Sequence, residues 1–314
     1  MTFAFVFPGQ GSQTIGMGRD LYDNFSAARH VVAEVEEVLQ HKLSHIMFEG
    51  SIEDLMLTEN TQPALLTASI MAVRVIEEET KKPLSSIASL MAGHSLGEYS
   101  ALCAAGYLSL ADAVRLVRLR GQAMQNAVPV GIGAMAAILG LDLPIIEQNL
   151  STFTKTEHLC VVANDNSPAQ VVISGHKAAV DEAITLCTTA GAKRGIILPV
   201  SAPFHSPLMA PAAEVMAHAF ADIQLNNVSV DIIANVTAMP FVGIDMIVPS
   251  LVQQITERVR WCESISHMKQ LGSTTFIELG IGKVLSGLIK RIESDVTTMS
   301  VQNSSELSTF LSLC

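Results

Sequence analysis

This sequence has few charged residues and no closely paired cysteines, whereas many charges or paired cysteines are features of disordered, disulfide-rich and zinc-binding proteins. Only 16 % of the 314 residues are charged while 49 % are apolar, which excludes a disordered or fibrous protein. The five cysteines are odd in number, widely spaced and without a C-x-x-C pair, so neither a disulfide framework nor a zinc site is expected. The length suffices for a sizeable core.

Long hydrophobic runs are also missing. The first apolar run, Phe3 to Phe7, stops at Pro8 and has no basic residues before it, so it is too short for a signal peptide. No other run reaches the length of a membrane span. We therefore expect a cytoplasmic protein with no membrane partner.

Positive charge is in short supply, because 19 Lys and Arg face 30 Asp and Glu, for a net charge of −11. Such a field repels a phosphate backbone, so we expect no nucleic-acid partner. An acidic protein could still dock on a local basic patch. The pairs Lys193-Arg194 and Lys290-Arg291 are candidates for such a patch, and a solvated surface explains them equally well.

The pattern of apolar runs predicts alternating strands and helices, and thus a parallel sheet covered on both faces. In the first part of the chain the expected elements are a strand at Phe3–Phe7, helices near Phe25–Gln40 and Ala64–Glu78, a strand at Ile87–Ala92, and helices to about Gln125. The same α/β pattern resumes after about residue 200, with a helix expected from Pro207, strands at Val230–Ala234 and Thr275–Glu278, and helices at Pro249–Arg258 and from Lys283.

The stretch between these two parts reads strand, helix, strand, strand, helix, strand, which is the ferredoxin-like order. The expected elements are Ala134–Leu139, Pro144–Leu150, Leu159–Ala163, Gln170–Ser174, Ala178–Thr189 and Arg194–Pro199. We therefore predict a small domain, residues 128–198, inserted into a larger one made of residues 1–127 and 199–314.

A nucleophile motif occupies the turn after the strand at Ile87–Ala92. Gly93-His94-Ser95-Leu96-Gly97 matches the G-x-S-x-G elbow, with a strand entering, a helix leaving and glycines where the backbone is strained. This context favours Ser95 as a nucleophile over a simple turn of small residues.

A serine hydroxyl needs a base, which in this kind of fold comes later in the chain. His205 lies in a loop between a predicted strand and a predicted helix, where functional residues concentrate. His218 falls within a helical pattern and His267 beside Lys269, so packing or surface roles explain both. His205 is the predicted base.

The loop Phe7 to Gln13 follows the first strand and contains two glycines. It lacks the lysine of a phosphate-binding loop and the glycine spacing of a dinucleotide site. A second arm of an oxyanion hole suits it better, with Gln10 as one donor and the main-chain N–H of Leu96 as the other.

Arg120 is the anomaly of the helical pattern Asp112–Met124. It falls between Ala113, Val117 and Met124 on the apolar stripe. An unpaired guanidinium there would cost several kcal/mol, so it should meet an anion. A structural Asp or Glu and a substrate carboxylate are both possible partners.

Taken together, these segments resemble the malonyl-CoA:acyl-carrier-protein transacylase family of fatty-acid synthesis. The matching motifs occur in the same order over nearly the whole chain: Phe7–Gln13, Thr61-Gln62-Pro63-Ala64, Gly93–Tyr99, Arg120-Gly121, the His205 loop and Gly280–Leu285. The resemblance implies an α/β-hydrolase-like core with an inserted ferredoxin-like domain.

The resemblance also implies a role for each site residue. It makes Ser95 the acylated nucleophile, His205 its base and Arg120 the group that grips the malonyl carboxylate. The remaining implied roles are the oxyanion hole for Gln10 and Leu96, the cleft wall for Gln62 and Asn164, and, for the main-chain carbonyl of Gln254, the orientation of His205 in place of a triad acid.

Two positions depart from the family or vary within it. Ile281 stands where the family usually has proline, which affects only a local turn. Phe204 precedes the histidine, and related polyketide-synthase domains with Phe there tend to select malonyl. We therefore expect Phe204 to take part in substrate selection.

The implied reaction is a ping-pong acyl transfer from malonyl-CoA to the phosphopantetheine thiol of acyl carrier protein, with no metal and no cofactor. A serine esterase would explain Ser95 and His205 but leave Arg120 without a role. A non-catalytic docking module would leave the pairing of Ser95 with His205 unexplained.

Overall fold

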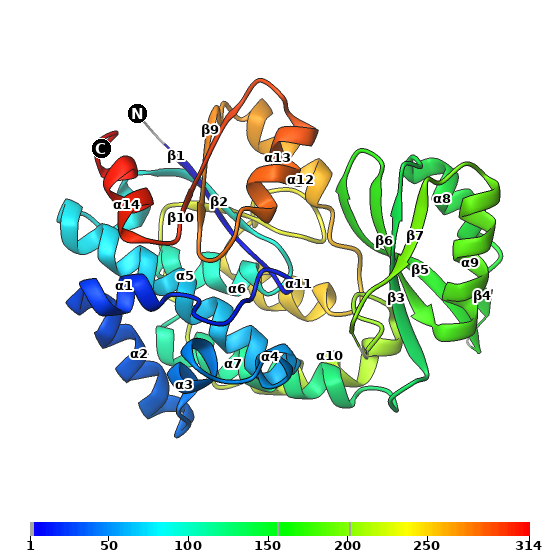
Figure 1. Cartoon of the computed structure of the whole chain (residues 1–314), viewed down its shortest axis with the longest axis horizontal. Coiled ribbons are helices and arrows are strands. Elements are labelled where there is room, and N and C mark those ends of the chain that lie inside the picture. The colour runs from blue at the N-terminus through cyan, green and yellow to red at the C-terminus, as the bar shows by residue number, and fades with distance from the viewer. Residues whose placement is uncertain (1–2, 156, 201) are drawn as a thin grey trace.

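The computed structural model describes residues 3–155, 157–200 and 202–314, which form two sheets with their helices (Figure 1). The larger unit contains a parallel five-stranded sheet in the order β10-β9-β1-β2-β8. Its strands are β1 (Phe3–Phe7), β2 (Ala88–Gly93), β8 (Asp231–Ile233), β9 (Thr275–Leu279) and β10 (Thr297–Val301). The predicted parallel α/β core is confirmed.

Strand β1 lies at the centre of this sheet, and all five of its residues are buried. Its side chains alternate between two faces, as a strand requires. Phe5 and Phe7 join the core that includes α5 and α6, whereas Ala4 and Val6 join the core with Trp261. Because both faces are covered, a continuous apolar run is the sequence signature to expect here.

The helices of the larger unit lie on both sides of the parallel sheet (Figure 1). They are α1 (Arg19–Asn24), α2 (Ser26–Leu39), α3 (Leu43–Phe48), α4 (Ile52–Met56), α5 (Thr58–Thr80), α6 (Gly97–Ala105), α7 (Leu110–Asn126), α10 (Ala210–Ala219), α11 (Ile247–Gln254), α12 (Trp261–Gln270), α13 (Val284–Ile292) and α14 (Ser304–Leu311), with short 3-10 turns at Leu84–Ser86, Pro207–Met209 and Ile244–Met246.

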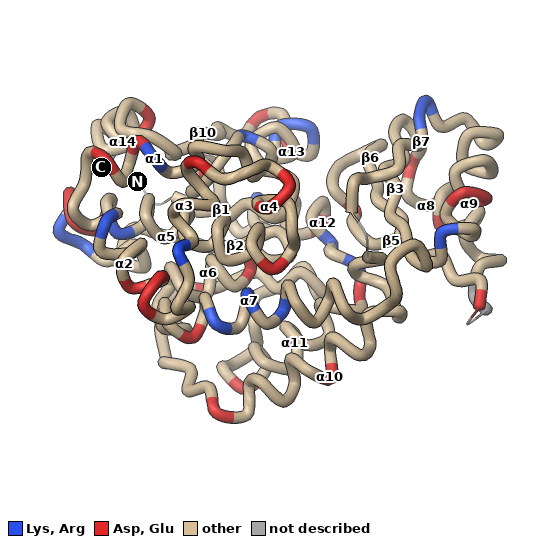
Figure 2. Tube along the Cα trace, turned by 60° about the horizontal axis from the view of Figure 1, so that its bottom comes forward, with Lys and Arg blue, Asp and Glu red and all other residues tan. Residues whose placement is uncertain are grey.

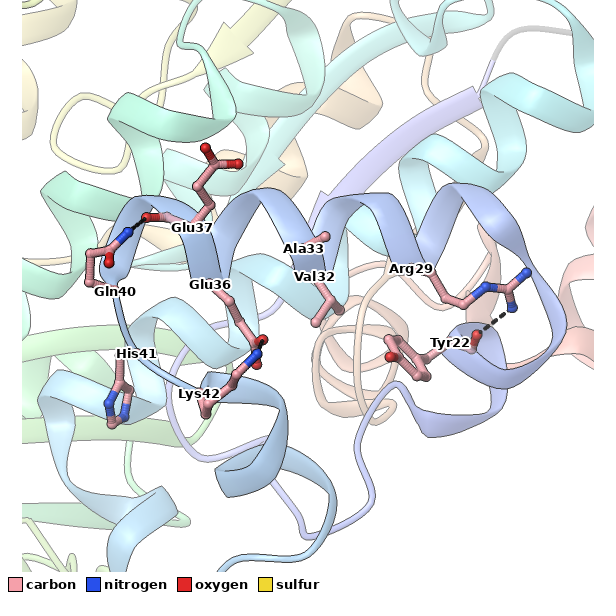
Figure 3. A pocket seen from close by; sticks show the side chains of 9 residues that line it. All are labelled: Tyr22, Arg29, Val32, Ala33, Glu36, Glu37, Gln40, His41 and Lys42. Carbon is pink, nitrogen blue, oxygen red and sulfur yellow. Dashed lines mark hydrogen bonds and ion pairs between the residues drawn. The ribbon is translucent and has the colours of Figure 1, made fainter.

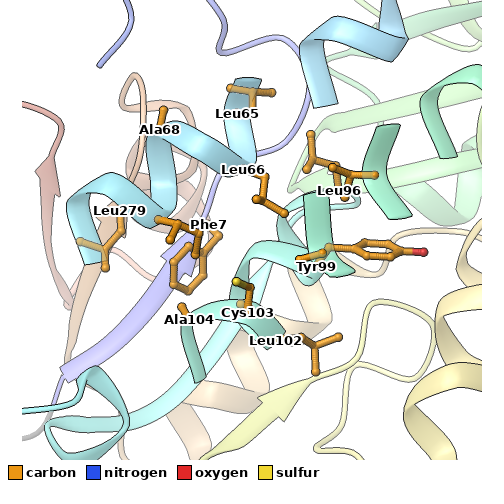
Figure 4. Packing of buried hydrophobic residues seen from close by; sticks show 14 of the residues in the cluster. Phe7, Leu65, Leu66, Ala68, Leu96, Tyr99, Leu102, Cys103, Ala104 and Leu279 are labelled. Atoms are coloured by element: carbon orange, nitrogen blue, oxygen red, sulfur yellow. The ribbon is translucent and has the colours of Figure 1, made fainter. Parts of the chain in front are cut away.

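The packing beneath the end of β2 fixes the position of α6. Figure 4 shows Phe7 of β1 among side chains of α5 and α6, with Leu66 and Leu96 nearby. Tyr99 on α6 is fully buried in the same cluster. Because a helix as short as α6 is only marginally stable alone, packing against this dense apolar core keeps its first turn in place.

The smaller unit is an antiparallel sheet in the order β4-β5-β6-β3-β7, at the right of Figure 1. Its elements are β3 (Gly133–Leu139), α8 (Leu143–Leu150), β4 (Thr154–Lys155), β5 (His158–Ser167), β6 (Gln170–His176), α9 (Lys177–Thr189) and β7 (Arg194–Ile197). Apart from the two-residue β4, the order is the predicted β-α-β-β-α-β. The exact domain limits at residues 128 and 198 stay predictions.

The helix predicted at Pro249–Arg258 is too long, because α11 ends at Gln254. The following segment instead reaches the smaller sheet, where Val259 forms an isolated parallel bridge with Asn164. The main-chain N–H of Asp165 donates to the Val259 carbonyl at 3.0 Å. Contacts with a distant segment thus override the local helical pattern.

Figure 2 shows that positions of Lys and Arg are interspersed with positions of Asp and Glu along the chain in both units. None of the described helices is long and apolar enough to cross a membrane. Within residues 3–155, 157–200 and 202–314, no group of three or more His, Cys, Asp or Glu side chains is arranged to hold a metal ion.

Candidate active site

The turn between β2 and α6 presents Ser95 at the carboxyl end of the parallel sheet. Ser95 has a left-handed backbone with φ of 52°, a conformation that costs energy for a residue with a side chain. The flanking glycines are required by space: a Cβ on Gly93 would lie 1.9 Å from the carbonyl carbon of Gly97, and one on Gly97 would lie 2.1 Å from the Phe7 oxygen. The strand–turn–helix geometry predicted for this motif is present.

Asn235, which follows β8, stabilises the strained turn through two side-chain hydrogen bonds. Its Oδ1 accepts from the Ser95 main-chain N–H at 2.7 Å, and its Nδ2 donates to the Gly93 carbonyl at 2.7 Å. The side chain is buried. Sequence reasoning missed Asn235, although a polar residue directly after a buried strand at the same sheet edge was a usable signal.

Ser95 and His205 form a hydrogen-bonded pair, with 2.7 Å between Oγ and Nε2. His205 Nδ1 lies 2.8 Å from the main-chain carbonyl of Gln254. A carbonyl only accepts, so the proton resides on Nδ1, and Nε2 is free to accept from the serine hydroxyl. The structure thus brings together the three groups that the resemblance implies for the nucleophile, its base and the orienting carbonyl.

Burial lowers the pKa of His205 to about 3, and the nearby positive charge of Arg120 acts in the same direction. The imidazole is therefore neutral at physiological pH, the form in which Nε2 can accept a proton. His205 also has a left-handed backbone, with φ of 55°. Strain at both members of the pair is typical of functional sites.

Arg120 lies on α7 and is 1 % exposed, as its place on the apolar stripe predicted. Its guanidinium donates to Gln62 Oε1 at 2.9 Å, to Gln254 Oε1 at 2.8 Å and to Ser95 Oγ at 3.1 Å. It also lies over the Tyr99 ring, 5.6 Å from the centroid. No ion pair among the described residues includes Arg120. A structural carboxylate partner, the first of the two possibilities, is not found there.

A cavity of about 100 Å³ opens beside the Ser95–His205 pair. It is lined by Gln10, Gln62, His94, Ser95, Leu96, Arg120, Met124, Met135, Asn164, Leu198, Val200, Phe204 and His205. All predicted site residues except Gln254 are on this wall, and Gln254 lies behind His205. The structure places Gln10 and Leu96 beside the nucleophile, and their role as oxyanion donors stays a prediction.

Sequence reasoning missed several wall residues. Met135 and Leu198 come from the smaller unit, and no local pattern distinguishes them from other core residues. His94 was quoted in the motif without a role. Its Nε2 lies 2.7 Å from Asn166 Oδ1, its ring is 5.5 Å from that of Trp261, and burial lowers its pKa. The contact with Asn166 of β5 joins the elbow to the smaller sheet, whereas Trp261 belongs to α12 of the larger unit.

A larger cavity of about 620 Å³ lies on the surface beside α2 (Figure 3). Some of its polar side chains already have partners. Lys42 pairs with Glu36 at 2.8 Å, and Arg29 donates to the Tyr22 carbonyl at 2.9 Å. It contains no nucleophile beside a base, so the chemistry is expected at the smaller cavity.

The site has a serine on a strand–turn–helix elbow at the carboxyl edge of a parallel sheet, and this serine is hydrogen-bonded to a histidine. These features define the class of α/β enzymes with a serine nucleophile. The comparisons with known proteins narrow this class. Residues 4–304 match the family described as the acyl transferase domain. The chain belongs to this acyl transferase family.

Relatives resemble the chain over nearly its full length. It is 47 % identical to malonyl CoA-acyl carrier protein transacylase of Bacillus subtilis, over 96 % of this chain and 93 % of the relative. The crystal structure of acyl-carrier-protein-S-malonyltransferase from Bartonella henselae superposes with a TM-score of 0.96 at 48 % identity, covering 100 % of this chain and 99 % of the other. A third match is a structure described as a type II polyketide-synthase acyl-carrier protein (holo) in complex with its malonyl-transacylase. The superposition has a TM-score of 0.95 at 41 % identity and covers 100 % of this chain and 100 % of the matched chain.

Proposed function

We propose that this acyltransferase moves the malonyl group of malonyl-CoA to the phosphopantetheine thiol of an acyl carrier protein, and thereby supplies fatty-acid synthesis. The observation that carries the proposal is the buried guanidinium of Arg120, 3.1 Å from Ser95 Oγ and bonded only to neutral acceptors. Such a charge favours an acyl group with its own carboxylate close to the reacting carbonyl. The names of the relatives agree with this substrate.

In the first half-reaction, Ser95 Oγ attacks the thioester carbonyl while His205 Nε2 takes the hydroxyl proton. The carbon–sulfur bond breaks, and the CoA thiol leaves with that proton. In the second, the carrier thiol gives its proton to His205, and its sulfur attacks the malonyl-serine ester. The carbon–oxygen bond breaks and Ser95 regains its proton, which completes a ping-pong cycle.

The other site residues have supporting roles in this proposal. The main-chain N–H of Leu96 and a donor of Gln10 stabilise the oxyanion. The carbonyl of Gln254 keeps His205 in the tautomer with Nδ1 protonated, a task that a carboxylate performs in a triad. Gln62 and Asn164 contact the acyl chain, and Phe204 limits its width.

The proposed reaction needs no metal and no cofactor, because activated serine chemistry and a charge clamp account for each step. Its partners are malonyl-CoA and acyl carrier protein, with no role for nucleic acid or membrane. A cytoplasmic location fits these substrates.

The test is intact-mass measurement of the protein mixed with malonyl-CoA, followed by addition of phosphopantetheinylated carrier protein. We expect a malonyl adduct that persists without an acceptor and moves to the carrier on its addition. Failure to form an adduct would refute the proposed nucleophile. An adduct lost to water at the same rate with and without carrier would indicate an esterase instead.

A further inference from the structure

A second buried charge-bearing group lies close to the site and has no role in the reaction described above. Glu98 is on the first turn of α6 and is 0 % exposed. No ion pair among the described residues includes it, and its Oε1 has no hydrogen-bond partner there. Burying a carboxyl group in this way is costly, so its presence here calls for a physical reason.

The side-chain hydrogen bonds of Glu98 are all made by its other oxygen, Oε2. Gln254 Nε2 donates to it at 2.7 Å, and the main-chain N–H of Asn235 donates at 3.3 Å. Glu98 does not line the cavity. It can therefore act on the reaction only through other residues, and Gln254 is the closest of these.

The side-chain amide of Gln254 lies between Glu98 and Arg120. Its Nε2 donates to Glu98 Oε2 and also to the Ser95 carbonyl at 2.8 Å, while its Oε1 accepts from the Arg120 guanidinium at 2.8 Å. A guanidinium can only donate, and the Ser95 carbonyl can only accept. Turning the amide over would place like groups against each other on both sides, so its direction is fixed.

We propose that Glu98 is a positioning residue for selection of the acyl group. Through the side-chain amide of Gln254, it holds the Arg120 guanidinium in the position where it can bind the malonyl carboxylate. This inference rests on the proposed function. It assigns to Glu98 the preference for carboxylated over plain acyl groups, and leaves the nucleophile and base to Ser95 and His205.

The geometry separates this role from simple support of the elbow. A defect in the elbow would disturb Ser95 and slow every acyl substrate alike. A displaced Arg120 would slow malonyl transfer, whose substrate carries a carboxylate, and leave acetyl transfer nearly unchanged. The readout is therefore the ratio of kcat/KM for malonyl transfer to kcat/KM for acetyl transfer. Both values are normalised to the concentration of protein whose Ser95 can be acylated.

The test compares Glu98→Leu, which removes the acceptor at similar volume, with Glu98→Gln, which keeps one carbonyl acceptor. Burial raises the pKa of Glu98 to about 8, with Gln254, Asn235 and Arg120 opposing that shift. The carboxyl is thus mostly neutral at pH 7, and the glutamine variant imitates it. We expect Glu98→Leu to lower the malonyl-to-acetyl ratio about tenfold or more, the scale for loss of one buried partner. The ratio should stay within about threefold of the parent in Glu98→Gln.

A matched control is Glu278→Leu. Glu278 is equally buried, and it accepts hydrogen bonds from Leu285 and Ser286 at the start of α13, away from the cavity. This variant should lower the melting temperature and leave the ratio unchanged. Gln254→Met removes the amide link but keeps the main-chain carbonyl for His205, so it should reproduce the loss of ratio even if Glu98→Leu does not fold.

The proposal is overturned if Glu98→Leu slows both substrates equally, or if Gln254→Met leaves the ratio intact. An equally large drop in Glu98→Gln would also overturn it, because an acceptor remains there. Failure of the proposed function would look different. In that case the parent protein itself would form no malonyl adduct on Ser95.

Discussion

Replacement of Arg120 by methionine tests the proposed substrate most directly. Methionine fills the space of the arginine stem and removes the charge and all three hydrogen bonds of the guanidinium. Two unit charges about 4 Å apart attract each other by about 4 kcal/mol at an effective dielectric constant of about 20. Truncation of one partner in buried charge pairs costs about 2–5 kcal/mol, or roughly 30- to several-thousand-fold in rate.

The assay is kcat/KM for transfer from malonyl-CoA and from acetyl-CoA, measured beside the melting temperature. We expect the malonyl value to fall by that factor and the acetyl value to change little or to rise, because acetyl has no carboxylate. Loss of a desolvated charge offsets loss of its hydrogen bonds, so the melting temperature should stay within about 5 °C of the parent. A folded Arg120→Met protein that still prefers malonyl as strongly as the parent would refute the reasoning. Equal loss of both activities with a much lower melting temperature would make Arg120 structural.

The other predictions concern the nucleophile, the base and the pocket wall. Ser95→Ala should form no malonyl adduct by intact mass, whereas His205→Ala should form it more slowly by orders of magnitude, since the oxyanion hole remains. A malonyl adduct on Ser95→Ala would show that the nucleophile is misassigned. Because the pKa of His205 is held near 3 in the unliganded protein, its neutral form is lost only as pH falls through that value. The kcat/KM for acylation, which reports the unliganded protein, should be flat from pH 8 to about 5, and a fall centred near pH 6.5 would contradict this. Phe204 lines the cavity, so methylmalonyl-CoA should be a poorer substrate by about 10–200-fold in kcat/KM, and equal values would remove Phe204 from the specificity argument.

The elements that sequence reasoning found are those whose signal is local and strong. Strand β1 coincides with the apolar run Phe3–Phe7, and the glycines around Ser95 identify a turn that only small residues can form. Arg120 was recognised as buried because a helical period of 3.6 residues puts it among apolar neighbours. In each case the signal lies within a single helix, strand or tight turn.

Two elements near the C-terminus were not predicted, for different reasons. The edge strand β10 reads Thr-Thr-Met-Ser-Val, too polar to stand out as a buried strand. Helix α14 did carry a usable signal, since Asn303 caps it by accepting from the Glu306 main-chain N–H at 3.0 Å. An Asn followed three residues later by Glu is close to the capping-box pattern.

The parts of the site that sequence could not reveal are those made by distant segments meeting. Asn235 is 140 positions from the Ser95 N–H that it binds, and Met135 and Leu198 reach the cavity only because the smaller sheet packs beside the elbow. The partner of Arg120 was undecidable for the same reason. Whether a buried cation meets a structural carboxylate depends on residues that the helix pattern does not contain.

The resting site combines several unfavourable features, and their cost is consistent with a surface prepared for an anion. Ser95 and His205 both hold strained backbones. Burial pushes the pKa of His205 down and that of Glu98 up, so the neutral form of each is favoured. Arg120 alone keeps a charge, without a carboxylate bonded to it among the described residues. A malonyl carboxylate would supply that missing partner and offset the positive charge that weakens His205 as a base. Binding of the correct acyl group would therefore strengthen the base that acts on Ser95, a coupling that plain acetyl could not provide.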